Sequence, residues 1–458
     1  MTQRTPSSKR TRPRVLLLTY HYDRAASMES RLSWRRAQHA AEDYDTTVIC
    51  AEGEQSDRLD SIQISGEPPI EVIPIPLNKL ERFVMRLPWG FYLAYRLWHR
   101  RVLKRISRVH SQQPFSLVHH VSFCGYREPS DGWRLGVPFI WGPIGGTHNF
   151  PGRFLSQVHF MGGAREIARN ALNSWQLRHS RLVKKALNSA DMVAVASESA
   201  RTALSGLADH TPQVLLETGV DPVSVRRTPR DTAKPLKILW SGRLQCWKAL
   251  PLLLRAMAEL PLDCCVQVRV MGEGPRLAAW QKLAEQLTVA DRIQWIGWPN
   301  YQWQLPQYQW ADVFAFTSLR DTSGTGLLEA LAAGTPIIGL DHQGAADIMN
   351  LECAVPVPVT NPKRTITAIR DAIVDLSTDP SKLAELSRGA VVRAKKYTWE
   401  GQRVAMKAIY ATALQAAGST GQAPAEDEQE AQELSSREVP SVNESHEGKP
   451  ARGVLVGR

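Results

Sequence analysis

Residues 317–336 read TSLRDTSGTGLLEALAAGTP, and this stretch decides the predicted fold. The apolar run Val313–Thr317 has the composition of a buried strand, and a loop rich in glycine, serine and threonine follows it. A helical pattern then ends in a Gly-Thr-Pro turn, after which Pro336–Leu340 has the composition of the next strand. A strand, a helix and a second strand in this order form a βαβ unit, which indicates a parallel sheet.

The same alternation of short apolar runs and longer amphipathic runs occupies both halves of the chain. The other predicted strands are Val15–Tyr20, Thr46–Ala51, Phe115–Val121, Val137–Trp141, Met192–Ser197, Leu236–Ser241, Val266–Met271 and Ile293–Ile296. A polar stretch that contains proline separates the two groups of strands. We therefore predict an α/β protein with two doubly wound, Rossmann-like domains that face each other across a cleft.

The predicted organisation has six parts. They are a flexible N-terminus (1–13), a first domain (14–221), a linker (222–235), a second domain (236–400), a C-terminal helix (401–417) and a tail (418–458). The tail is acidic and has too few large apolar side chains to offset the entropy of folding, so we predict that it is disordered.

Composition narrows the class of protein. The chain has 458 residues, which is more than one hydrophobic core usually serves, and a net charge of +11, which favours an anionic partner. Its six cysteines form no CxxC pair or Cys/His cluster, so neither a disulfide framework nor a zinc site is indicated. The apolar run near the N-terminus is too short for a signal peptide or a membrane span, and we expect a cytoplasmic protein.

Basic side chains follow the first strand of the second domain, where residues 241–248 read SGRLQCWK. Small residues at this turn allow a phosphate to approach the backbone and the start of the next helix. Arg243 and Lys248 can neutralise a diphosphate, although basic residues near strand ends are more often simply solvated.

The glycine-rich stretch adds carboxylates to this prediction. Asp321 lies in the loop and Glu329 on the following helix, where they can accept hydrogen bonds from ribose or sugar hydroxyls. The amides of the loop can bind phosphate oxygens. Without the surrounding glycines, Glu329 would be interpreted as an ordinary exposed helical glutamate.

Together these two stretches resemble the retaining glycosyltransferases of the GT-B fold, in particular family four. That family has a Gly-Arg-Leu…Lys segment and a Glu-x7-Glu motif before a Gly-x-Pro turn. Arg243, Lys248 and Glu329 match these motifs, whereas Asp321 stands where the first glutamate is usual. Further similar segments are Met271–Pro275, Asp291–Trp298, which is like the segment beside the nucleobase, and Thr218–Asp221.

The resemblance implies a reaction and a set of site residues. A glycosyl group would move, with retention, from a nucleoside diphosphate sugar on the second domain to an acceptor on the first. Catalytic roles fall on Arg243, Lys248 and Glu329. The predicted donor-binding residues are Gly242, Gly272, Ile296, Asp321, Thr322, Ser323, Gly324, Thr325, Gly326 and Leu327.

The first domain departs further from the family. Residues 27–34 replace its usual glycine-rich loop, and the histidine that many members carry after the strand at Val137–Trp141 is missing. Candidates for contacts to the acceptor or the sugar, each with a structural role as the alternative, are Glu29, His119, His120, Gly145, Gly146 and His148.

The motifs and the family resemblance also lead to expectations about a metal and about binding partners. No convincing Asp-x-Asp metal site is present, so we expect no cofactor and no metal requirement. The expected acceptor is a saccharide or a lipid-linked saccharide of the cell envelope or an exopolysaccharide. A sugar-nucleotide epimerase is the alternative on this fold, and a nucleic-acid-binding protein is disfavoured because no nucleic-acid-binding motif occurs.

Residues 79–110 form a segment of unusual composition. They contain nine Lys or Arg residues and one acidic residue, interleaved with aromatic residues. One interpretation is a surface that binds anionic membrane, which would make the protein peripheral on the inner face of the membrane. The other is a solvated basic helix whose aromatic side chains pack on the core.

Overall fold

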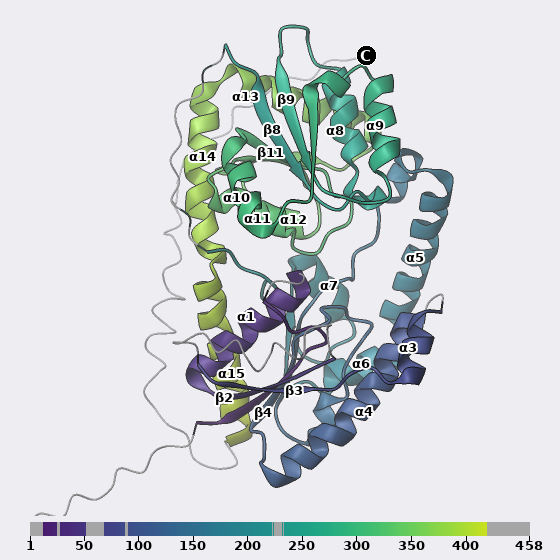
Figure 1. The fold of residues 1–458 in the computed structure, drawn as a ribbon, viewed down its shortest axis with the longest axis vertical. Helices are drawn as coiled ribbons and strands as arrows, with labels where there is room; N and C mark the ends of the chain where they lie inside the picture. The colour runs from purple at the N-terminus through teal and green to yellow at the C-terminus, as the bar shows by residue number, and fades with distance from the viewer. Residues whose placement is uncertain are drawn as a thin grey trace, which may run out of the picture. The chain divides into compact units, whose positions relative to one another are not determined.

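The computed structural model describes residues 12–24, 28–51, 68–87, 90–221, 223, 231 and 233–418. Almost all of the predicted flexible N-terminus, most of the predicted linker and nearly all of the predicted tail lie outside these residues, as do Ser27 and Trp89. Two parallel β-sheets, each accompanied by helices, make up the described fold (Figure 1). No helix in these ranges is long and apolar enough to span a bilayer.

The first sheet has seven strands in the order β3-β2-β1-β4-β5-β6-β7, and all its pairings are parallel. Its strands are β1 (Arg14–Leu18), β2 (Asp45–Cys50), β3 (Ile70–Pro74), β4 (Leu117–His120), β5 (Phe139–Ile144), β6 (Met192–Val195) and β7 (Gln213–Val214). The helices of this half are α1 (Met28–Asp43), α3 (Lys79–Met85), α4 (Gly90–Gln112), α5 (Phe160–His179), α6 (Arg181–Asn188) and α7 (Glu198–Ser205).

The second sheet has six parallel strands in the order β10-β9-β8-β11-β12-β13. They are β8 (Leu236–Ser241), β9 (Val266–Met271), β10 (Ile293–Gly297), β11 (Val313–Phe316), β12 (Ile337–Asp341) and β13 (Ala354–Pro358). The helices that follow β8 are α8 (Leu250–Ala258), α9 (Leu277–Gln286), α10 (Tyr301–Trp310), α11 (Thr325–Ala332), α12 (Gly344–Ile348), α13 (Pro362–Thr378), α14 (Pro380–Ala394) and α15 (Trp399–Gly418).

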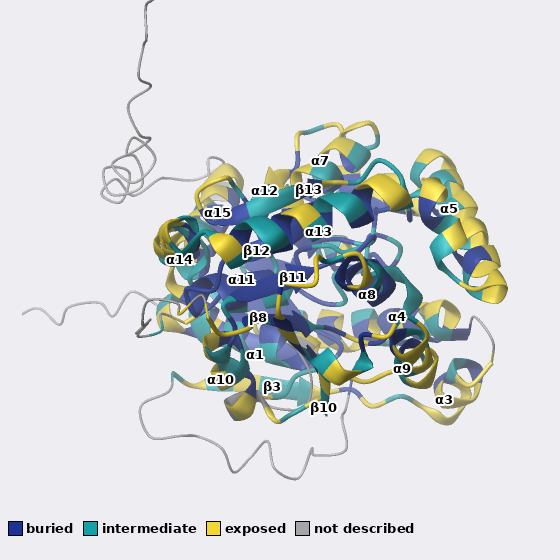
Figure 2. Cartoon of the chain, turned by 90° about the horizontal axis from the view of Figure 1, so that it is seen from above, coloured by how far each residue is buried: buried dark blue, intermediate teal, exposed yellow. Residues whose placement is uncertain are grey.

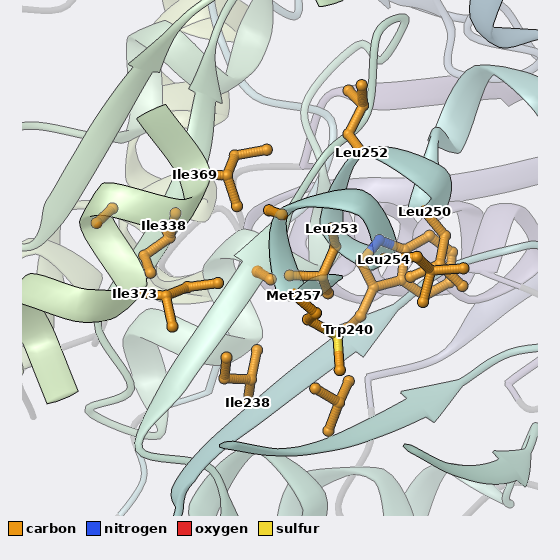
Figure 3. Close-up of a cluster of buried hydrophobic side chains, with 14 of the residues drawn as sticks. Ile238, Trp240, Leu250, Leu252, Leu253, Leu254, Met257, Ile338, Ile369 and Ile373 are labelled. Atoms are coloured by element: carbon orange, nitrogen blue, oxygen red, sulfur yellow. The ribbon is translucent and has the colours of Figure 1, made fainter. Parts of the chain in front are cut away.

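Helix α8 shows how the second half builds its core. Its sequence LPLLLRAMA is apolar on almost every side, and Leu252, Leu253 and Leu254 are fully buried. Together with Trp240 of β8 and Ile369 of α13 they belong to one buried cluster (Figure 3). Burial of each such side chain contributes about 1.5–3 kcal/mol. The strong packing of α8 fixes the segment directly before it, which contains the predicted phosphate-binding residues.

The last helix returns to the first sheet. Met406, Ile409 and Tyr410 of α15 belong to the buried cluster that includes Val15 and Leu17 of β1. Before α15 begins, the backbone pairs with the segment that leaves the first half, because the Val220 amide donates to Tyr397 O and the Trp399 amide to Val220 O. Both segments that cross between the halves are therefore hydrogen-bonded to each other.

All ten predicted strands are present, and Leu236–Ser241 and Val266–Met271 have the predicted bounds. Three observed strands were not predicted, namely β3, β7 and β13. Each lies at an edge of its sheet. Proline is tolerated at a sheet edge, and β13 contains two prolines, so its composition resembles that of a loop.

Candidate active site

The two stretches singled out in the sequence follow neighbouring strands. Strands β8 and β11 pair directly, and the chain continues from β8 to β9 on one side and from β11 to β12 on the other. The sheet order therefore reverses between β8 and β11. In open parallel sheets, ligands bind at such a switch point, beyond the carboxyl ends of the strands.

Hydrogen bonds fasten these two stretches to each other. The Thr317 hydroxyl donates to Lys248 O at 2.8 Å, and the Leu319 amide donates to Trp247 O at 2.8 Å. Lys248 is the last residue of a short 3-10 turn, Cys246–Lys248. The backbone that carries Lys248 is thus held on the loop after β11.

Lys248 and Asp321 form an ion pair at the switch point. The Lys248 Nζ atom donates to Asp321 Oδ2, and the two side chains are 19% and 21% exposed. The other carboxylate oxygen of Asp321 accepts from the Thr322 amide at 3.1 Å. The sequence predicts this lysine and this aspartate from two different motifs. In the structure they are in contact, and both side chains are partly exposed to solvent.

The glycines nearby allow the strand ends to approach closely. A β-carbon at Gly272 would lie 2.0 Å from Gly242 O, and one at Gly242 would be 3.6 Å from the Lys248 side chain. Gly272 therefore permits contact between the ends of β8 and β9. Ile296 lies one position before the end of β10, whose Gly297 carbonyl accepts from the Gly272 amide at 2.8 Å.

Glu329 lies on α11 and is bound by a tyrosine. Tyr308 of α10 donates its hydroxyl to Glu329 Oε2 at 2.7 Å. Burial raises the pKa of Glu329, while this hydrogen bond and the charge of Arg31 lower it. Gly324, at φ 63°, precedes the helix, so Thr325, Gly326 and Leu327 form its first turn. Glu329 is therefore not the ordinary exposed glutamate of the alternative interpretation.

Arg243 and Glu29 come from the two halves and interact electrostatically. Glu29 lies in the first turn of α1, and Arg243 is exposed after β8. Partial burial raises the pKa of Glu29, whereas the positive charge of Arg243 lowers it. This electrostatic interaction connects one predicted acceptor residue with one predicted donor residue.

The loop after β11 also contacts the first half directly. A β-carbon at Gly145 would lie 2.4 Å from the Thr322 side chain, so only glycine leaves room for this contact. Gln343 accepts from the Asp321 amide at 3.0 Å and donates to Asn149 O at 2.9 Å. The loop is thus in contact with the segment that follows β5.

Two carboxylates of the first half bind this loop, and neither was predicted. Glu166 of α5 accepts two hydrogen bonds from Arg320, at 3.1 and 3.2 Å, and its side chain is 4% exposed. Glu217 accepts from the Ser323 hydroxyl at 2.7 Å. The pKa of Glu217 is raised to about 7, mainly by burial; the hydrogen bond from Ser323 lowers it, and the negative charges of Asp321 and Glu29 contribute to the rise. Glu217 directly precedes the Thr218–Asp221 motif, and this position was its only signal in the sequence.

Among the predicted histidines, His148 is the one with an electrostatic link to the second half. It is buried and interacts with Ser197 Oγ at 3.3 Å. Its pKa is lowered to about 4, mainly by burial; the charges of His342 and Arg320 contribute to the decrease, and the charge of Asp321 opposes it. His148 is therefore neutral at pH 7 and lies in the electrostatic field of Asp321.

His119 and His120 are core residues in this structure. The Nε2 atom of His119 lies 2.7 Å from Gly142 O and its Nδ1 atom 2.6 Å from the Tyr410 hydroxyl. His120 Nδ1 accepts from the Ser130 amide, and its Nε2 atom lies 3.2 Å from both Tyr95 Oη and Ser122 O. Burial lowers their pKa values to about 3 and about 4. All four ring nitrogens are occupied by the fold.

The amide of Gly145 is likewise occupied. It donates to Cys124 O at 2.6 Å, so it is not available for a sugar. Gly146 lies beside it, and its carbonyl accepts from Arg169 at 3.5 Å. Within the residues that the structure describes, no three His, Cys, Asp or Glu side chains gather as a metal site would require.

A family model matches the second half of the chain. Residues 225–390 match the family "Glycosyl transferases group 1". D-inositol 3-phosphate glycosyltransferase of Mycobacterium leprae (strain Br4923) is 32% identical over 190 residues, which are 39% of this chain and 42% of that protein. The enzyme of the same name from Streptomyces avermitilis is 32% identical over 202 residues, 41% of each chain. The chain thus spans about two fifths of the length of these relatives.

Solved structures match nearly the whole described fold. Sucrose-phosphate synthase from Thermosynechococcus elongatus has a TM-score of 0.64 at 19% identity, over 88% of this chain and 100% of that one. Anabaena HepE in complex with UDP-glucose has a TM-score of 0.57 at 16% identity, over 87% and 99%. The predicted fold is confirmed: the chain has the two-domain α/β architecture of GT-B glycosyltransferases.

Proposed function

We propose that this protein is a glycosyltransferase that moves a sugar from a nucleoside diphosphate sugar to a saccharide or a lipid-linked acceptor. One observation carries the proposal. Lys248 and Asp321, each about one fifth exposed, meet at the switch point of the second sheet, inside the segment that matches the glycosyltransferase family. The first turn of α11 follows in the same loop, and helix N-termini favour phosphate.

Lys248 and Arg243 would stabilise the diphosphate that leaves. As the bond between the sugar and the phosphate breaks, negative charge grows on the phosphate oxygens, and fixed positive charges stabilise it without a protein nucleophile. The Lys248 ammonium already has an anionic partner in Asp321. A bound diphosphate would therefore compete with the Asp321 carboxylate for this ammonium group.

Glu329 would orient the ribose or the donor sugar. The Tyr308 hydroxyl holds one carboxylate oxygen in place. The second oxygen would then accept a hydrogen bond from a hydroxyl of the donor in a fixed direction. Such positioning raises the rate because the reacting groups are already aligned.

We further propose retention at the anomeric carbon and no metal requirement, as the resemblance to the retaining family implies. The relatives that match are named for transfer to an inositol phosphate, and one structural neighbour is bound to UDP-glucose. These names support a nucleoside diphosphate sugar as the donor. We propose a cytoplasmic location, peripheral on the inner face of the membrane, and an acceptor from the cell envelope or an exopolysaccharide.

Both interpretations of residues 79–110 apply to parts of that segment. Tyr95 and Trp98 of α4 are buried in the core, as the solvated-helix interpretation expects. Leu80, Phe83 and Leu93 are exposed beside arginines, as membrane binding requires. The exposed part supports the peripheral location.

The proposal is tested by a thermal-shift screen of nucleoside diphosphate sugars. A ligand that binds only the folded state raises Tm by mass action, so the correct donor should stand out from the others. The donor is then incubated with candidate acceptors, and the anomeric configuration of the product is read by NMR. Conversion of the donor to its epimer without any acceptor would instead identify an epimerase, and a screen in which no nucleoside diphosphate sugar binds would refute the proposal.

A further inference from the structure

Helix α5 has an outer face on which apolar side chains are left uncovered. Phe160, Met161 and Trp175 are 90%, 76% and 58% exposed. Ile167 and Leu172 are exposed on the same helix. Isolated apolar residues are normal on a protein surface, but five large ones on one helix are not. We call these five residues the α5 face; in Figure 2 much of α5 is coloured as exposed.

The charges around the α5 face are almost all positive. Residues 160–185 contain a single acidic residue, Glu166, and it is buried against Arg320. Exposed basic side chains accompany the apolar ones along α5 and the start of α6, namely Arg165, Arg178, Arg181, Lys184 and Lys185. The solvent side of this segment therefore presents apolar and cationic groups and no carboxylate.

We propose that the α5 face docks on the surface of a bilayer that contains anionic lipid. A helix with an apolar outer face and flanking bases lies in the plane of the membrane interface, where the apolar groups enter the boundary with the acyl chains and the bases meet the headgroup charges. A protein partner would more often be met by a mixture of both charge signs, which this segment lacks. Exposed side chains extend from Phe160 to Trp175, about four turns of one helix, which suits a flat surface.

The inner face of the same helix contacts segments that form the candidate active site. Arg169 donates to His148 O at 2.8 Å and Asn173 to Thr147 O at 2.6 Å. Glu166 binds Arg320 of the donor loop. Docking of α5 would therefore hold the segment after β5 and the loop after β11 next to the lipid surface. This consequence rests on the proposed function, because it places a lipid-linked acceptor beside the donor.

Helices α3 and α4 support this orientation. In both Figure 1 and Figure 2, α3 and α5 lie toward the same side of the molecule. The exposed Phe83 and Leu93 of these helices, with Arg96 and Arg100, provide a second cationic and apolar region. A planar membrane would then be contacted by two separate elements of the first half.

The test uses the full chain and vesicles of phosphatidylcholine, with or without phosphatidylglycerol, in a sedimentation assay. Phe160→Ser, Met161→Ser and Trp175→Ser are combined in one variant. The matched control carries Leu262→Ser, Leu351→Ser and Val392→Ser, which replace exposed apolar residues of the second half. We expect the α5 variant to bind the anionic vesicles at least about tenfold more weakly than the wild type, while the control variant binds as the wild type does.

The second part of the test examines the charge of the α5 segment. The double variant Arg165→Glu, Arg178→Glu should lose binding to the anionic vesicles, and salt should release the wild type. The proposal is overturned if the wild type ignores anionic vesicles, if the α5 variant and its control bind alike, or if α5 substitution only abolishes self-association in size-exclusion chromatography, which would identify a second copy as the occupant.

Nucleotide binding separates this inference from the proposed function. Thermal shifts by nucleoside diphosphates should be the same in the α5 variant and the wild type, because none of the three replaced side chains belongs to the candidate active site. Vesicle binding without any nucleotide effect would refute the proposed function and leave the docking surface standing. Nucleotide binding without vesicle binding would refute the docking surface and leave the proposed function standing.

Discussion

The two sheets place polar residues at corresponding edges, but those residues have different roles. In the second half, Lys248 and Asp321 lie in loops beyond the strands and are partly exposed. In the first half, His119 and His120 are the last residues of β4, and both are fully buried. Side chains within a central parallel strand point into the core on either face, whereas those past its end are free to meet a ligand. Of these two pairs, only Lys248 and Asp321 are therefore positioned for chemistry.

The largest effect should come from Lys248→Ala. If the second sheet holds the diphosphate, loss of this charge should lower kcat/KM by roughly 2–4 kcal/mol, on the order of a hundredfold or more. Affinity for a free nucleoside diphosphate should fall as well, because the phosphate charge is already present in the ground state. Lys282→Ala, on the exposed face of α9, removes the same charge elsewhere and should change neither value. Full transfer activity and normal nucleoside diphosphate affinity in Lys248→Ala would show that the second sheet does not hold the diphosphate through this residue.

His119→Leu should affect stability and leave donor binding intact. The substitution leaves the Tyr410 hydroxyl and Gly142 O without their partner, and a buried polar group without a hydrogen bond costs about 1–3 kcal/mol. Urea unfolding should reveal this loss, whereas nucleoside diphosphate affinity at a temperature below the transition should match the wild type. Weakened donor binding with unchanged stability would show that the first-half histidine also belongs to the site.

Substitutions at Asp321 sharpen the account of the second half. Asp321→Asn removes the charge that Lys248 now binds, so affinity for a free nucleoside diphosphate should rise, by about tenfold if one charge contact is released. Transfer should nevertheless fall if the carboxylate also meets the donor sugar. Asp321→Glu restores the family's longer side chain and should keep or raise activity in that case. Reduced activity of Asp321→Glu would show that the site has repacked around aspartate.

The smallest expected effect concerns Glu217 and pH. Its pKa is about 7 in the folded protein, above the usual value near 4.5, so the folded state holds a proton that the unfolded state has lost. The stability from this group is present at low pH and is lost as pH rises from about 4.5 through 7. Glu217→Gln should therefore raise stability at pH 8 by at least about 1 kcal/mol and by clearly less at pH 5, as read from Tm at both values. An equal change at both pH values would contradict this assignment.

Most of the architecture was predictable because both sheets consist mainly of buried parallel strands. Such strands are short, continuous apolar runs, and β8 and β9 have the predicted bounds. The missed strands β3, β7 and β13 are edge strands, which need less apolar sequence and are more tolerant of proline. The return of α15 to the first sheet was also missed, since periodicity shows which face of a helix is apolar but not which sheet it will cover.

The site was predictable to the extent that it follows strand ends. Arg243, Lys248 and Asp321 were found because their loops follow β8 and β11, which are neighbours in a doubly wound sheet. Glu217, Glu166 and Tyr308 could not be found in the same way. Their roles depend on contacts with Ser323, Arg320 and Glu329, which only the arrangement of the two halves and of α10 creates.

Hydrogen exchange of the full chain with and without a nucleoside diphosphate tests the central claim most directly. If the ligand binds at the switch point of the second sheet, amides in residues 241–249 and 318–329 should exchange more slowly when it is bound, because binding suppresses local opening. Peptides from β4, with His119 and His120, should show no comparable change. Protection confined to the first half, or no protection at a saturating ligand concentration, would contradict the placement of the donor on the second half.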